Sequence, residues 1–187
     1  MPQVFHAHYA NRAGHDDVVV ATGRMEIWQS RWMQPFAFLF RWTKTLVPVR
    51  QNDIATTVMF RTRKDESAFW YERRFDLGNG RQVEFVSRLE HRSGDQVIEW
   101  TGSGIGWWST FTFEEGRVVL SHLGYRVRLA GFEQSLPLTW LFGRPSAWEE
   151  AVSENEFRME MSIDHPLLGR IYSYAGHFRI EEIALEQ

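Results

Sequence analysis

The stretch "AFWYERRFDLGNGRQVEFVSRLEH", residues 68–91, decides the fold. Residues 68–77 and 81–91 both alternate between apolar and polar side chains, and a period of two is typical of β-strands. The "GNG" at 78–80 between them consists of residues that tolerate positive φ, which favours a tight hairpin turn. This segment therefore predicts two antiparallel strands joined by a short connection.

The same alternation extends to both sides of this hairpin. Strands are predicted over residues 18–28, 54–61, 96–102, 107–114, 117–130, 157–163 and 170–182. Nine or ten strands joined by short turns form an antiparallel meander, and a sheet that long curls or closes to hide its edges. We expect a mainly β fold, a curved meander forming a calycin-like barrel or half-barrel with room inside for one small ligand.

Three segments do not fit simple alternation. Residues 34–46, "QPFAFLFRWTKTL", place Pro35 at a first helical position and predict an aromatic helix packed against the sheet. An interfacial membrane helix is the alternative for this segment. Residues 131–146 contain Gly and Pro and indicate a long loop with a short apolar insert. Residues 148–163 have helical propensity, but the alternation from Phe157 to Ile163 favours a strand.

Composition sets the broad class of protein. The 187 residues suit a single domain, 1–187, and 15% aromatic side chains suit a large core or an aromatic-lined cavity. A net charge of -3 without a basic block argues against a nucleic-acid partner. Neither a secretory signal nor an apolar run long enough to span a bilayer is visible, so a cytoplasmic location is expected.

The strand 69–77 suggests where a ligand would lie. If Phe69, Tyr71, Arg73 and Phe75 form its inner face, Arg73 points into the barrel. A buried guanidinium requires a partner, because an isolated buried charge is too costly. Both an internal carboxylate and an acidic group on a ligand fit this requirement.

Other side chains complete the expected ligand site. Trp107 and Trp108 are adjacent, so one points inward and the other outward. Glu149 or Glu150 is the preferred partner of Arg73, or of Arg126 and Arg128. The predicted ligand-binding residues are Trp70, Tyr71, Arg73, Phe85, Trp107, Tyr125 and Glu149.

Signals for metal, cofactor or catalysis are weak. His6 and His8 would share a face on a strand, and His15 lies near, but an HxH pair alone does not predict a metal site. The absence of cysteine excludes thiolate chemistry. His122 lacks a nucleophile elbow, and no G-x-G-x-x-G motif is present. We therefore predict no metal, no cofactor and no catalytic residue.

The order of segments resembles the bacterial domain of unknown function 4166 family. The most specific parts are Trp70, Arg73 and Phe75 in "WYERRF", and the closing "PLLGRIYSYAGHF" at 166–178. "FHAHYANRAG" and "LPLTWLFG" also match, so the resemblance covers nearly the whole chain. It implies no established activity. It also implies that some relatives carry this domain behind a nicotinamide-dependent reductase-like domain.

These observations lead to three functional hypotheses. The first is a small-molecule binding domain for a lipid-like or amphipathic acid, with Arg73 receiving the acidic group. The second is an enzyme domain, an isomerase or reductase partner, with an acid/base pair in the same cavity. The third is a structural or assembly module, which fits a possible homodimer.

Overall fold

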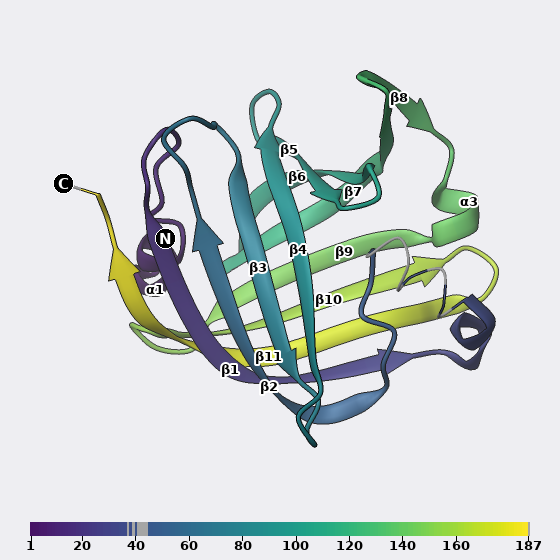
Figure 1. Ribbon diagram of the computed structural model, residues 1–187, viewed down its shortest axis with the longest axis horizontal. Coiled ribbons are helices and arrows are strands. Elements are labelled where there is room, and N and C mark those ends of the chain that lie inside the picture. Colours follow the sequence, from purple (N-terminus) through teal and green to yellow (C-terminus); the bar gives the residue numbers. More distant parts are fainter. Residues whose placement is uncertain (37, 39, 41–44, 187) are drawn as a thin grey trace.

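The computed structural model describes residues 1–36, 38, 40 and 45–186, and Figure 1 shows a sheet rolled into a barrel. Eleven antiparallel strands lie in this part of the chain, in place of the nine or ten expected, so the mainly β prediction is confirmed. They are β1 (Val18–Gln29), β2 (Gln51–Arg61), β3 (Phe69–Asp76), β4 (Gln82–His91), β5 (Gln96–Thr101), β6 (Ile105–Glu114), β7 (Arg117–Leu129), β8 (Phe132–Leu136), β9 (Arg144–Ala151), β10 (Glu156–His165) and β11 (Gly169–Ala184).

The barrel is closed by the pairing of β6 with β7. The sheet order runs β6-β5-β4-β3-β2-β1-β11-β10-β9-β7, and the additional β6–β7 ladder joins its ends. On its other edge β7 pairs with β9 through Arg117–Leu120 and with β8 through Tyr125–Leu129. β8 is therefore a short extra strand outside the ring. Closure leaves no strand of the ring without a neighbour on each side, although residues 82–86 of β4 have no partner in the shorter β5.

Of two segments that do not fit simple alternation, one differs from the sequence-based expectation and the other follows it. Residues 131–146 are not a long loop, because β8, the short helix α3 (Thr139–Phe142) and the start of β9 occupy them. Gly131 and Gly143 both have positive φ, so they turn the chain before β8 and after α3. Residues 148–163 hold the end of β9 and most of β10, which pair with each other as a hairpin.

The expected helix at 34–46 falls largely outside the described residues, which omit 37, 39 and 41–44. Its described beginning belongs to a 3-10 helix, η1 (Arg31–Phe36), with Pro35 inside it. No helix in the described ranges is both long enough and apolar enough to cross a membrane.

The N-terminal segment forms a helix, α1 (Gln3–His8), and lies at the left end of the barrel in Figure 1. Val4 and Phe5 are fully buried. The expected strand geometry for His6 and His8 is wrong, because on a helix two residues two apart point in different directions. His8 is buried, whereas His6 is exposed.

The core explains two glycines of β1 and β11. A Cβ atom on Gly23 or on Gly176 would lie 2.7 Å from the ring of Phe178. Phe178 is buried and stacks on Phe157 with ring centroids 5.6 Å apart. The aromatic ring thus covers the two glycines, and this packing accounts physically for Gly176 and Phe178 in the closing sequence motif.

Replacing Gly23 by Ala is expected to destabilise the barrel by about 1–3 kcal/mol, because the added methyl overpacks the Phe178 ring and backbone. The Cβ would also lie 2.1 Å from the His177 carbonyl oxygen. Urea unfolding followed by circular dichroism measures this change. Gly124→Ala in β7 is the control, since its Cβ would meet its nearest neighbour at an ordinary 3.6 Å. Equal stability of both variants would contradict this packing account.

Candidate functional site

The barrel holds a cavity of about 420 Å³ at the end opposite α1. Its wall is formed by the inner faces of strands, and its mouth by η1, α3 and the β10–β11 turn, which lie at the right in Figure 1. The lining residues are Trp32, Met33, Phe40, Thr45, Leu46, Val47, Arg73, Phe75, Phe85, Glu99, Thr101, Ile105, Trp107, Tyr125, Trp140, Leu141, Phe142, Pro145, Met161, Ile163, His165, Leu168, Ile171, Tyr172 and Tyr174. The wall is mostly apolar and aromatic, which is typical of small-molecule sites.

The structure brings only part of the predicted site together. Four of the predicted residues line the cavity: Arg73, Phe85, Trp107 and Tyr125. The other three lie elsewhere: Tyr71 packs against the core, Glu149 contacts α1 and Trp70 is on the outer face.

The inner face of strand 69–77 is the one that carries Arg73. Its Nη2 donates to Glu99 Oε1 at 3.0 Å and its Nη1 donates to Ser87 Oγ at 2.9 Å. Ser87 Oγ also donates to Glu99 Oε1 at 2.5 Å. The two charged side chains are only 12% and 14% exposed, so Arg73 and Glu99 form a largely buried, neutral ion pair. The expectation that Glu149 or Glu150 pairs with Arg73 is therefore wrong.

Aromatic rings hold this ion pair in place. The Arg73 guanidinium carbon lies 5.3 Å from the Tyr71 ring centre and 5.2 Å from that of Phe85. Burial acts to lower the pKa of Arg73, but Glu99, with smaller contributions from Tyr174 and Tyr71, keeps that pKa raised. Burial also raises the pKa of the neighbouring Tyr174 to about 12. Tyr174 is therefore a neutral phenol at ordinary pH.

A second polar group closes the α1 end of the barrel. The Tyr9 hydroxyl donates to Glu149 Oε2 at 2.6 Å, and His8 Nε2 lies 3.4 Å from the same oxygen. Burial acts to raise the pKa of Glu149, but His8, Tyr9 and Arg73 together hold it below its ordinary value. These contacts tie α1 to β9, so the role of Glu149 in the structure is to anchor the helix.

His122 and His165 bind neighbouring segments. His122 Nε2 lies 3.1 Å from Thr139 Oγ1, and burial lowers the pKa of His122. His165 Nε2 donates to the Trp140 carbonyl at 2.8 Å, while its Nδ1 accepts from Leu167 N–H at 3.2 Å. This pattern requires a neutral imidazole. Within the described ranges, no group of three or more acidic, His or Cys side chains could hold a metal.

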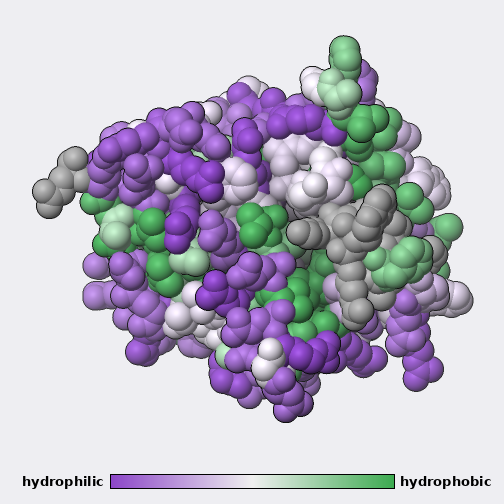
Figure 2. All heavy atoms as spheres, viewed as in Figure 1, coloured by the Kyte–Doolittle hydropathy of each residue, from purple (hydrophilic) through white to green (hydrophobic). Residues whose placement is uncertain are grey.

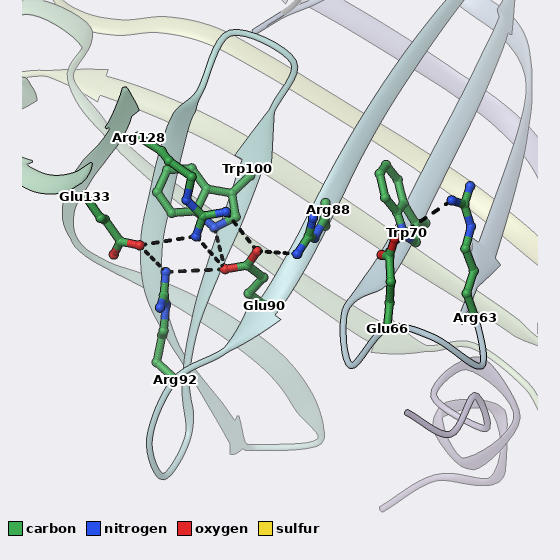
Figure 3. A network of polar contacts seen from close by, with 9 residues as sticks. All are labelled: Arg63, Glu66, Trp70, Arg88, Glu90, Arg92, Trp100, Arg128 and Glu133. Carbon is green, nitrogen blue, oxygen red and sulfur yellow. Dashed lines mark hydrogen bonds and ion pairs between the residues drawn. The ribbon is translucent and has the colours of Figure 1, made fainter. Parts of the chain in front are cut away.

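The outer face of the same strands carries stacked arginine and tryptophan side chains (Figure 3). Trp70 donates to Glu66 and lies beneath Arg63. Trp100 donates to Glu90, which also binds arginines from neighbouring strands. Trp108 on this outer face stacks on Arg126. The charged and aromatic side chains of residues 69–77 are therefore divided between the two faces of the strand. Trp70 stacks with an arginine on the outer face, whereas Arg73 and Phe75 line the cavity.

Sequence reasoning missed Glu99, Tyr174 and the residues of α3. Alternation within "QVIEWT" places Glu99 and Trp100 on opposite faces, so the sequence contained part of the signal. The pairing of Arg73 with Glu99 depends on the register of β3, β4 and β5, which a single sequence does not give.

The fold and cavity define a closed antiparallel β-barrel with an internal pocket. The chain belongs to the family described as "Domain of unknown function (DUF4166)", whose family model matches residues 1–178. This confirms the resemblance drawn from the sequence motifs.

Other comparisons are distant. No curated protein matches the chain. The YwiB protein from Bacillus subtilis is similar at 7% identity, with 94% of this chain and 99% of that chain covered and a TM-score of 0.29. The dehydratase domain of the polyketide PpsC from Mycobacterium tuberculosis is also 7% identical, with 96% of this chain and 80% of that chain covered and a TM-score of 0.22. Neither likeness supports an argument about function.

The Arg73–Glu99 pair leads to a stability prediction. Arg73→Met is expected to lower the free energy of unfolding by roughly 3–5 kcal/mol, because it leaves Glu99 charged and unpaired in the interior. Arg73→Met combined with Glu99→Leu should cost less than the sum of the single changes. Guanidinium unfolding of all variants measures this coupling.

The control for this cycle is the adjacent pair Arg74–Glu84, which lies 3.1 Å apart on the outer face and is 52% and 61% exposed. Its coupling energy should stay within about 1 kcal/mol. Additive effects at Arg73 and Glu99, similar to those of the exposed pair, would contradict a buried ion pair.

Proposed function

We propose that the barrel binds a small, largely apolar molecule in the cavity beside Arg73 and Glu99. The single observation that carries this proposal is a mostly apolar cavity of about 420 Å³ with the Arg73–Glu99 ion pair in its wall. Ligand sites usually occupy about 300–1,000 Å³ and combine apolar walls with a few fixed polar groups. A lipid-like chain would replace water against the aromatic wall, and its polar end would meet the ion pair.

The polar end of the ligand is best matched by an uncharged group. Arg73 is already neutralised by Glu99 at 3.0 Å, so a carboxylate beside it would also face the Glu99 carboxylate. The Arg73 guanidinium has five N–H donors, and Glu99 and Ser87 accept only part of them. An alcohol, ester or ketone oxygen could accept from the remaining donors. The acidic headgroup expected from sequence is thus less well supported than a neutral one.

Hydrogen bonding favours binding over acid/base catalysis. Glu99 Oε1 accepts from two groups, and both ring nitrogens of His165 are engaged. The Tyr125 hydroxyl donates to the Gly143 carbonyl, and the Tyr172 hydroxyl donates to the Val47 carbonyl. A general acid or base needs access to a reacting atom, and these oxygen and nitrogen atoms already take part in hydrogen bonds within the protein.

Ligand uptake is tested with dodecanol, methyl laurate and lauric acid, followed by titration calorimetry and native mass spectrometry. Ile105 lines the cavity, so Ile105→Trp should fill space and weaken binding of dodecanol at least about tenfold. Thr110→Trp, on the outer face of the same strand, is the matched control and should bind as the unchanged protein does. Absence of binding for all three compounds would overturn the proposal.

The headgroup preference has its own test. Glu99→Gln leaves the Arg73 charge uncompensated, so this variant should gain affinity for lauric acid relative to dodecanol. The unchanged protein should prefer dodecanol or methyl laurate. A preference for lauric acid in the unchanged protein, unaltered by Glu99→Gln, would contradict the neutral-headgroup assignment while leaving cavity binding intact.

A further inference from the structure

Exposed apolar side chains surround the mouth of the cavity. We call this set the rim, and it consists of Trp32 from η1, Trp140 and Leu141 from α3, and Leu167 and Leu168 from the β10–β11 turn. These side chains are between 46% and 76% exposed. Figure 2 shows apolar surface at this right-hand end of the molecule. Exposed apolar side chains gathered in one place indicate an interaction surface.

The rim is continuous with the cavity. Trp32, Trp140, Leu141 and Leu168 line the cavity as well as being exposed, so apolar side chains extend from the outside of the molecule into the cavity. Leu167 is 76% exposed and lies on the rim without lining the described cavity. A molecule that enters this opening from an apolar environment would contact these apolar side chains on its way in.

The protein holds the rim segments in place. His165 donates to the Trp140 carbonyl and accepts from the Leu167 N–H, so one imidazole joins α3 to the β10–β11 turn. Gly143 ends α3 with positive φ, and a Cβ there would lie 2.8 Å from Ile163. The exposed side chains are therefore presented by ordered backbone.

Among the described residues, two arginines beside the rim form no ion pair, and the carboxylate next to them, Asp164, which is the cross-strand partner of Arg144, lies 3.7 Å from Arg170. Arg31 precedes Trp32, and Arg144 follows α3; both are exposed, and neither forms an ion pair with any described residue. By contrast, Arg24, Arg158 and Arg170 each pair with a carboxylate. The sequences of the rim segments, "RWMQPF", "TWLF" and "PLL", contain no acidic residue.

We infer that the rim docks on the surface of an anionic lipid bilayer, with the cavity mouth facing the acyl chains. Tryptophan beside arginine is typical of side chains at a membrane interface. The rim side chains project from three separate short segments, which suits a soft apolar phase better than a flat protein face. The inference goes beyond the proposed function, because docking does not require that a ligand enter the cavity.

The test is flotation of the full chain with vesicles of phosphatidylcholine mixed with phosphatidylglycerol, and with vesicles of phosphatidylcholine alone. Binding should be stronger to the anionic vesicles and should fall as salt rises. Leu167→Glu should weaken binding about tenfold, since it removes an inserted apolar side chain. Arg31→Gln with Arg144→Gln should lose about fivefold per arginine on anionic vesicles only.

Phe113→Glu is the matched control, because Phe113 is 48% exposed on β6 near the opposite end of the barrel. It should bind vesicles as the unchanged protein does. No flotation of the unchanged protein, or equal loss in Phe113→Glu and Leu167→Glu, would overturn the inference. So would a homodimer that Leu167→Glu converts to monomer, because the rim would then be a protein interface.

Dodecanol binding in the absence of vesicles separates this inference from the proposed function. Leu167→Glu should retain dodecanol affinity while losing vesicle binding. A protein that floats with anionic vesicles but takes up no apolar compound would refute the proposed function and leave the docking inference standing. A protein that takes up dodecanol but does not float with anionic vesicles would refute the docking inference and leave the proposed function standing.

Discussion

The ladder between β6 and β7 is the pairing on which the rest of the structure depends. It joins Ile105 to Val127 at one end and Glu114 to Arg117 at the other, and without it the sheet would have two open edges. β7 then divides its second edge between β9 and β8. Among the described residues, 121–124 have no strand partner on that edge, and α3 approaches there through His122 and Thr139. Both the closure of the ring and the position of α3 at its mouth therefore depend on how the two edges of β7 are paired.

The interior is built around two hydrogen-bonded polar groups rather than an unbroken apolar core. Arg73 with Glu99 lies in the cavity wall, and Glu149 with Tyr9 and His8 lies against α1. The carboxylate of each group accepts a hydrogen bond from within its own group, which limits the cost of burying it. On the outer face, Arg128 stacks over the Trp100 ring and also forms ion pairs with Glu90 and Glu133. Arginine–glutamate pairs thus occur on both the inner and the outer face of the sheet.

Periodicity predicted the mainly β class and most of the strands. The alternation in residues 68–91 gave the β3–β4 hairpin, and most remaining strands followed from the same rule, because strand faces are a local property of the sequence. The opposite directions of Trp107 and Trp108 also followed, whereas the sequence left open which face of strand 69–77 points inward, and the structure shows that it is the face with Arg73. The resemblance in the closing motif was confirmed by the family model.

What failed depends on contacts that are distant in the chain. Glu99 is the partner of Arg73 because β3, β4 and β5 adopt one register, and no local pattern encodes that register. Residues 131–146 looked like a loop because Gly and Pro mark breaks. β8 and α3 exist because β7 and the β10–β11 turn provide their partners. The helix α1 was missed for a similar reason, since its buried face requires a barrel end to cover.

The pairing of β1 with β11 has a consequence for how the molecule is assembled. Val18 lies beside Ala184. The second edge of β1, the first strand of the barrel in chain order, is therefore covered only after β11, the last strand of the barrel, has been synthesised. Such non-local pairing raises contact order and slows folding. During translation β1 can form its ladder with β2 early, while its other edge stays unpaired and can bind strands of other chains. We therefore expect the nascent chain to be the form most dependent on chaperones, with protection arriving only when β11 emerges from the ribosome.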